Sequence, residues 1–152
     1  AELAAFCTGS LAISAETDAG SGSWEAAACR CLQDLEILEP DWLALLKQWE
    51  QAPELPGFAP QDPEKLERIA VYFAFRYLLK AVNDGDLLGR AQFCALGVLV
   101  TDRLSRFVGL PEALRLFSRE IEHNEDNLDT LLEQFWQTEG LSLSALLAAF
   151  GG

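Results

Sequence analysis

The segment from Leu66 to Asn83 constrains the fold more than any other part of the sequence. If it is helical, apolar residues point in nearly every direction around its axis, as in a helix buried at the centre of a bundle. One narrow polar stripe remains, formed by Arg76, Lys80 and Asn83. Because a buried cation is costly unless it is paired, we expect Arg76 and Lys80 to be mostly buried against acidic residues. The candidate acidic partners are Asp84, Asp86, Glu120 and Glu122.

The apolar pattern of the whole chain predicts an all-α protein, an irregular bundle of about five to six helices. Neither strand-like alternation nor a hairpin turn pair is present in the sequence. Gly85 and Gly109 are suited to end helices, and Asp86 is suited to cap the helix that follows it. The expected helices cover residues 24–39, 41–50, 64–83, 86–108, 111–137 and 141–150.

The last part of the chain contains a long amphipathic pattern. From Pro111, apolar or uncharged residues recur every three or four positions as far as Phe135. This spacing predicts one continuous helix that ends near Gln137. Asn124 occupies an inward position in this pattern, so we expect its amide to be buried and hydrogen-bonded.

Two segments read as connections rather than as helices. Residues 8–23 are rich in glycine, serine and other small residues, and residues 52–63 are rich in proline. We therefore expect residues 1–23 to be a linker or a partial segment and residues 24–152 to form a single helical domain.

The charge balance excludes some classes of partner. With 24 acidic and 11 basic residues, the chain has a net charge of −13, which opposes unaided binding to nucleic acid. No apolar run approaches the roughly 20 residues that cross a bilayer, and the four cysteines are irregularly spaced. We therefore expect a soluble, cytoplasmic protein that binds neither nucleic acid nor membrane.

A candidate polar site combines the charged residues of the central helix with a Glu-x-x-His sequence at Glu120–His123. Di-iron bundles use this spacing twice, and the chain has one histidine, so we expect no metal site. Tyr72 and Tyr77 could instead line a lysine-binding channel, although aromatic residues at helical spacing are more often core. The candidate residues are Arg76, Tyr77, Lys80, Asp84, Asp86, Glu120, His123 and Asn124, and no catalytic residue is identified.

Two short motifs suggest a family. Residues 75–82 read aromatic-Arg-Tyr-x-x-Lys-Ala-Val and are followed by Asp-Gly-Asp, and residues 120–123 read Glu-Ile-Glu-His with Asn-Leu at 127–128. Together they resemble the C-terminal half of the flagellin lysine-N-methylase family, over roughly residues 64–135. The cysteine-rich cluster motif of the family's N-terminal half is absent here.

The resemblance implies that the chain is a separated helical domain of an enzyme that transfers methyl groups from S-adenosylmethionine to lysines of flagellin. The domain would dock the protein substrate or line the active site, with the cofactor bound by the parent enzyme. No glycine-rich turn after a strand is present, so we expect no cofactor site in this chain and no activity of the domain alone. The alternative is a non-catalytic helical interaction or ligand-sensing module.

Overall fold

The protein is all-α in a computed structural model that describes residues 24–52 and 62–151. No strand occurs in these two ranges, so the predicted fold class is confirmed. The α-helices are α2 (Trp24–Asp34), α3 (Pro40–Glu50), α4 (Pro63–Tyr77), α5 (Ala81–Asp84), α6 (Leu87–Val108), α7 (Leu110–Phe117), α8 (Glu125–Gln137) and α9 (Leu143–Gly151). Three short turns join them: 3-10 turns η1 (Leu78–Lys80) and η3 (Glu139–Leu141), and the π-helical turn η2 (Ser118–Glu122).

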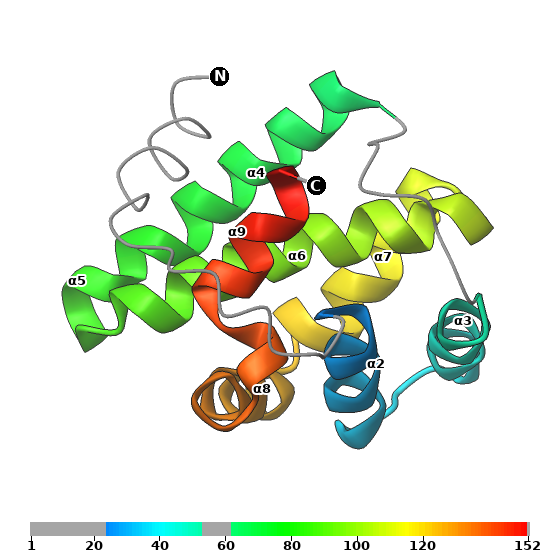
Figure 1. The fold of residues 1–152 in the computed structure, drawn as a ribbon, viewed down its shortest axis with the longest axis horizontal. Helices are drawn as coiled ribbons and strands as arrows, with labels where there is room; N and C mark the ends of the chain where they lie inside the picture. Colours follow the sequence, from blue (N-terminus) through cyan, green and yellow to red (C-terminus); the bar gives the residue numbers. More distant parts are fainter. Residues whose placement is uncertain (1–23, 53–61, 152) are drawn as a thin grey trace.

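Helix α6 forms the centre of the bundle (Figure 1). Helices α3, α4, α7, α8 and α9 all contact it. Residues 96–105 of α6 are buried without interruption, so this part of the helix is enclosed on every side. The sequence pattern assigned that central position to the segment now seen as α4, which lies alongside α6.

The core between α4, α6 and α7 is aromatic. The Phe73 ring of α4 lies with its centroid 6.1 Å from that of Phe93 and 5.8 Å from that of Phe117, in edge-to-face arrangements that aromatic pairs prefer. Gly97 of α6 permits this contact, because a Cβ there would lie 3.0 Å from the Phe73 ring. The side chains of Phe73, Phe93 and Phe117 are fully buried.

The expected helix over residues 64–83 is not continuous. Helix α4 ends at Tyr77, and the 3-10 turn η1 separates it from the single turn of α5. Gly85 then adopts a left-handed conformation with φ of 72°, and the Asp86 carboxylate accepts a hydrogen bond from the Gly89 amide at 3.0 Å. The predicted helix end and helix cap around residue 85 are therefore confirmed.

The expected continuous helix over residues 111–137 is also wrong. Helix α7 begins at Leu110, widens into the π-helical turn η2, and stops before Asn124. Asn124 has extended backbone angles and its side-chain oxygen accepts a hydrogen bond from the Asn127 amide at 3.1 Å, so it is the N-cap of α8. The short polar side chain of asparagine competes for backbone hydrogen bonds in this way, which favours caps over helix interiors.

The first expected helix is shorter than its pattern suggested. Helix α2 ends at Asp34, and residues 35–39 form a loop that leads into α3. Glu39, which precedes Pro40, has φ of −114° and ψ of 131°, the extended geometry that proline imposes on its predecessor. The linker predicted over residues 1–23 and most of the proline-rich loop lie outside the described residues. Within the described part of the chain, no helix has the length and apolarity needed to cross a membrane.

Candidate functional site

The polar residues singled out by the sequence fall into three separate groups. The first surrounds Glu120, the second surrounds Glu122, and the third is the turn between α5 and α6. An exposed apolar surface on α4 lies next to the second group.

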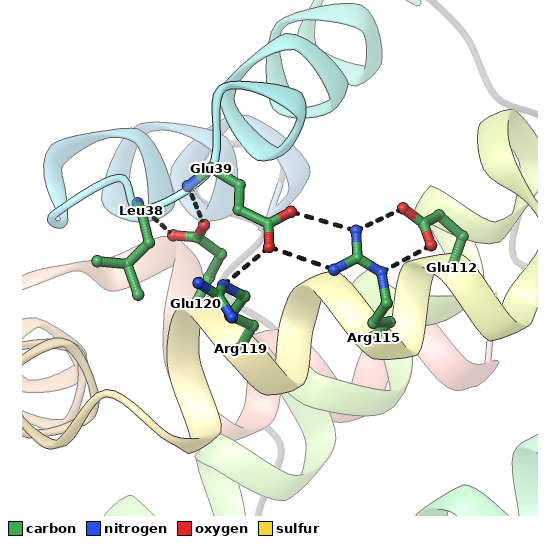
Figure 2. A network of polar contacts seen from close by, with 6 residues as sticks. All are labelled: Leu38, Glu39, Glu112, Arg115, Arg119 and Glu120. Carbon is green, nitrogen blue, oxygen red and sulfur yellow. Dashed lines mark hydrogen bonds and ion pairs between the residues drawn. The ribbon is translucent and has the colours of Figure 1, made fainter.

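Glu120 binds the backbone of the α2–α3 loop. Its carboxylate is fully buried and accepts hydrogen bonds from the amides of Leu38 at 2.9 Å and Glu39 at 2.6 Å (Figure 2). These amides lie at the N-terminus of α3, where the helix dipole favours a negative charge. Because both carboxylate oxygens are occupied by backbone amides, Glu120 holds the loop in place and is poorly suited to act as a general base.

The side chain of Glu39 extends this group to the surface. It accepts hydrogen bonds from both terminal nitrogens of Arg115, at 3.2 and 3.1 Å, and pairs with Arg119 at 2.8 Å (Figure 2). Arg115 also donates to Glu112, at 2.9 and 2.8 Å. The hydrogen bonds from Arg115 lower the pKa of Glu39 and that of Glu112 below their ordinary values.

Asn127 completes the attachment of the α2–α3 loop. Its side-chain nitrogen donates to the backbone carbonyl oxygens of Glu36 and Glu120, each at 2.8 Å. Its side-chain oxygen accepts a hydrogen bond from the backbone amide of Glu36 at 3.0 Å. We expected Asn124 to be buried, but it is only half-buried, and its nitrogen donates to the Glu36 carboxylate at 3.4 Å. Glu120, Asn124 and Asn127 thus all form hydrogen bonds with residues of the α2–α3 loop.

His123 is not part of this group. It is exposed at the end of the π-helical turn, whereas Glu120 faces the interior. The wider turn separates the two side chains that a regular α-helix would place side by side. Among the described residues, no cluster of three or more histidine, cysteine or acidic side chains could hold a metal ion.

The second group is centred on Glu122. One of its carboxylate oxygens accepts hydrogen bonds from the phenol groups of Tyr77 at 2.8 Å and Tyr72 at 3.1 Å. Burial, followed by the hydrogen bond to Glu122, raises the pKa of Tyr77. Burial is also the largest cause of the raised pKa of Tyr72. Both phenols therefore stay neutral and donate to the carboxylate.

Arg76 and Lys80 lie beside this group and are less buried than predicted. Arg76 is half-buried and Lys80 is exposed. Arg76 donates to the Tyr72 hydroxyl at 3.0 Å and so reaches Glu122 through the phenol. The guanidinium lies 5.9 and 5.7 Å from the ring centroids of Tyr72 and Tyr77, and the Lys80 ammonium lies 5.6 Å from that of Tyr77. The expectation of buried cations failed because α4 is not enclosed on all sides, so water solvates these groups.

The third group is structural. Asp84 pairs with Arg90 at 2.7 Å and accepts a hydrogen bond from the Asp86 amide at 2.9 Å. That backbone hydrogen bond, followed by the one from Arg90, lowers the pKa of Asp84. Asp84 and Asp86 fix the turn at Gly85 and do not contact Arg76 or Lys80 in the described structure.

Sequence reasoning missed buried charges inside α6. Arg103 is 3% exposed and pairs with Glu25 of α2 at 2.9 Å, and Asp102 is 1% exposed and lies 3.5 Å from Arg106. The sequence did contain a signal for these charges, because Asp102 and Arg103 closely follow a long apolar run. Charged residues in such a position are expected to be buried and therefore to need partners. The pair Arg103–Glu25 joins two helices that are far apart in the sequence.

An exposed apolar surface lies on the outer face of α4 and its continuation. We call it the α4 stripe and define it as Tyr72, Phe75, Leu79 and Val82, which are 44%, 60%, 61% and 86% exposed. Tyr72 and Phe75 lie on α4, Leu79 on η1 and Val82 on α5. Leu87 and Leu88, at the start of α6, are 62% and 44% exposed.

An open hollow of about 570 Å³ adjoins the first turns of α4, too open to exclude water from a reaction. It is lined by Glu64, Glu67, Arg68 and Val71.

Comparisons with known proteins add no family to this description. No protein-family model, no curated protein and no solved structure matches the chain. The resemblance to flagellin lysine-N-methylase therefore stays a prediction.

Proposed function

We propose that the chain is a non-catalytic protein-interaction module that binds a partner through the α4 stripe. The observation that carries this proposal is the exposure of four large apolar side chains along α4, η1 and α5, where the opposite face of α4 is core. Contiguous exposed apolar patches on monomeric proteins are often functional, because their exposure to water is otherwise unfavourable. Two of the four, Tyr72 and Phe75, are aromatic, a residue class enriched in the centres of interfaces.

The stripe has a rigid base, which supports a binding role. Phe73 and Tyr77, on the inner face of the same helix, are 0% and 1% exposed. The hydrogen bonds from Tyr72 and Tyr77 to Glu122 join α4 to the π-helical turn η2. A helix held in this way loses little further conformational entropy when its outer face is covered.

The methylase alternative is less well supported at this face. A substrate lysine would be recognised by aromatic faces and carboxylates. Arg76 and Lys80 already lie over the rings of Tyr72 and Tyr77, and their positive charges oppose the approach of a third cation. The role of the chain in a flagellin lysine-N-methylase, with S-adenosylmethionine bound by the parent enzyme, stays a prediction.

Selection from a displayed library of random 16-residue peptides tests the proposal. We expect enriched clones whose binding is lost in the double variant Phe75→Ser with Leu79→Ser. Trp136→Ser is the matched control, because Trp136 is 71% exposed on α8, away from the stripe. If no enriched clone depends on Phe75 and Leu79, the α4 stripe is not a binding surface and the proposal fails.

Titration calorimetry with S-adenosylmethionine tests whether this chain has a cofactor site of its own. The module and a separated methylase domain both predict no heat of binding at micromolar concentrations. Low-micromolar binding of the cofactor would contradict both and would favour an enzyme whose cofactor site lies in this chain.

A further inference from the structure

We propose that the partner of the α4 stripe is an amphipathic helix whose apolar face is flanked by acidic residues. This inference rests on the proposed function and adds the chemistry of the partner to it. Three observations carry it: the local charge, the shape of the stripe, and the absence of a sheet edge in the described structure.

The α4 stripe is flanked by basic residues, although the protein as a whole is acidic. Residues 68–83 contain Arg68, Arg76 and Lys80 and no acidic residue, whereas the whole chain has a net charge of −13. Arg68 and Lys80 are exposed, and Arg76 is half-buried. The carboxylate of Glu122, in η2, already accepts hydrogen bonds from the phenols of Tyr72 and Tyr77. Acidic residues on a partner would complement the remaining positive charge.

The helical positions place these cations along the apolar residues. Within α4, at 100° per residue, Arg68 lies in line with Phe75, and Arg76 lies one turn after Tyr72 at the edge of the stripe. Lys80 follows in η1. Glu64 and Glu67 lie beyond Arg68, toward the start of α4. Arg68 lines the same hollow as these two acids. A partner that covers the stripe from Tyr72 onward therefore meets Arg76 and Lys80 and avoids Glu64 and Glu67.

The shape of the stripe favours a helix over an extended peptide. From Tyr72 to Val82 the stripe runs along the end of α4, η1 and α5 for roughly 17 Å, at a rise of 1.5 Å per α-helical and 2.0 Å per 3-10 residue. A second helix can pack its ridges against such a surface. Addition of an extended peptide to a sheet edge is not open to residues 24–52 and 62–151, which contain no strand. These features favour a helical partner.

The same charges disfavour two other occupants. A second copy of the chain would bring the same cations face to face and add the mutual repulsion of two chains of net charge −13. An anionic membrane attracts clusters of four to eight basic residues, and it would repel the rest of this acidic protein. Both occupants are nonetheless outcomes of the experiment.

The experiment uses two synthetic 18-residue helical probes with one identical leucine face. The acidic probe carries glutamate at the flanking positions and the basic probe carries lysine there. Binding of each rhodamine-labelled probe to the full chain is measured by fluorescence anisotropy at low and high salt. We expect the acidic probe to bind at least about tenfold more tightly at low salt, and the difference to shrink at high salt as exposed charges are screened.

Variants assign the charge preference to the stripe. The double variant Arg68→Glu with Lys80→Glu should abolish or reverse the preference. Its matched control is Arg30→Glu with Lys47→Glu, which reverses two exposed cations on α2 and α3 and should leave the preference intact. The variant Phe75→Ser with Leu79→Ser should weaken binding of both probes.

The outcomes separate this inference from the proposed function. Equal binding of both probes, or tighter binding of the basic probe, with dependence on Phe75 and Leu79, overturns the acidic partner and leaves the binding surface standing. If neither probe binds, the acidic helix is also overturned. The peptide selection then shows whether the α4 stripe is a binding surface at all. If the protein floats with vesicles containing phosphatidylserine, and flotation depends on Phe75, the occupant of the stripe is a membrane and the helical partner is overturned. If the protein dimerises in sedimentation experiments, and dimerisation depends on Phe75, the occupant is a second copy of the chain. If the probes bind only after residues 1–23 are deleted, the deleted residues compete for the stripe. That result would also overturn the inference.

Discussion

The phenol of Tyr77 donates a 2.8 Å hydrogen bond to the carboxylate of Glu122, and this contact joins α4 to the π-helical turn that follows α7. Tyr77 is 1% exposed and Glu122 is 9% exposed, so the contact lies at the boundary between the core and the surface. It anchors the inner face of the helix that carries the exposed stripe. The stability of this contact therefore decides how rigid the proposed binding surface is.

Replacement of Tyr77 by phenylalanine should destabilise the protein without a change of fold. A buried hydrogen bond to a charged group contributes roughly 1.5–3 kcal/mol, and the variant removes one of the two donors to Glu122 while it keeps the ring. The free energy of unfolding from urea denaturation measures the loss. Tyr72→Phe is the control and should cost less, because Tyr72 is 44% exposed. Equal losses in the two variants would show that burial does not strengthen the Tyr77 contact.

Glu120 and His123, which the sequence paired as one motif, should respond to mutation very differently. Glu120→Ala leaves the part-buried amides of Leu38 and Glu39 without their acceptor, and an unsatisfied buried amide costs about 1–3 kcal/mol. His123 is exposed, so His123→Ala should change the free energy of unfolding by less than about 0.5 kcal/mol. Urea denaturation of both variants tests this. A similar loss in the two variants would restore the idea of a shared site.

The ion pairs of Arg115 predict how stability depends on pH. The pKa values of Glu39 and Glu112 are lowered in the folded protein, so in acid the unfolded chain binds more protons than the folded one. Their contribution is therefore complete above the ordinary value of 4.5, and it is lost as the pH falls through the lowered folded-state values. Added salt should reduce it, because these groups are at the surface.

Arg115→Gln tests this pH dependence. Urea midpoints measured between pH 6 and pH 3 should fall less steeply with decreasing pH in this variant than in the wild type. Arg30→Gln, on the exposed face of α2, is the control and should keep the wild-type slope. An unchanged slope in Arg115→Gln would mean that other carboxylates dominate acid unfolding.

The sequence predicted the parts of the fold that depend on local geometry. The end of α5 at Gly85 and the cap of α6 at Asp86 follow from the conformational range of glycine and from the reach of an aspartate side chain. Both signals act within a few residues, so no tertiary information is needed to read them. The limits of α6 at Leu87 and Val108 were predictable for the same reason.

The parts that failed depend on contacts between distant residues. The segment now seen as α4 is apolar on both faces, and nothing in its own sequence shows that α6, and not α4, is enclosed by neighbours. Glu122 was considered only as an acidic partner for the cations, because its phenol donors lie 45 and 50 residues earlier in the chain. The break at Asn124 was hidden because an asparagine fits both the inward position of a long helix and an N-cap.

Those two interpretations of Asn124 predict opposite effects of one substitution. In the interior of a continuous helix, Asn124→Leu would leave stability equal or higher, since apolar replacement of a buried polar group is often neutral or stabilising. As the N-cap of α8, Asn124 accepts the Asn127 amide and donates to Glu36, and leucine does neither. Replacement of a good N-cap by an apolar residue costs about 0.5–2 kcal/mol. We therefore expect Asn124→Leu to lower the free energy of unfolding by about 1 kcal/mol.

Asn124→Asp provides the matched control for the cap. Aspartate is as good an N-cap as asparagine, and its charge is favourable at the positive end of the helix dipole. Its carboxylate faces that of Glu36, which reduces this gain. Thermal and urea denaturation should therefore rank the wild type and Asn124→Asp close together, with Asn124→Leu clearly below both. A leucine variant as stable as the wild type would show that α8 does not need its cap, and that the π-helical turn and Asn127 alone hold the start of α8 against the α2–α3 loop.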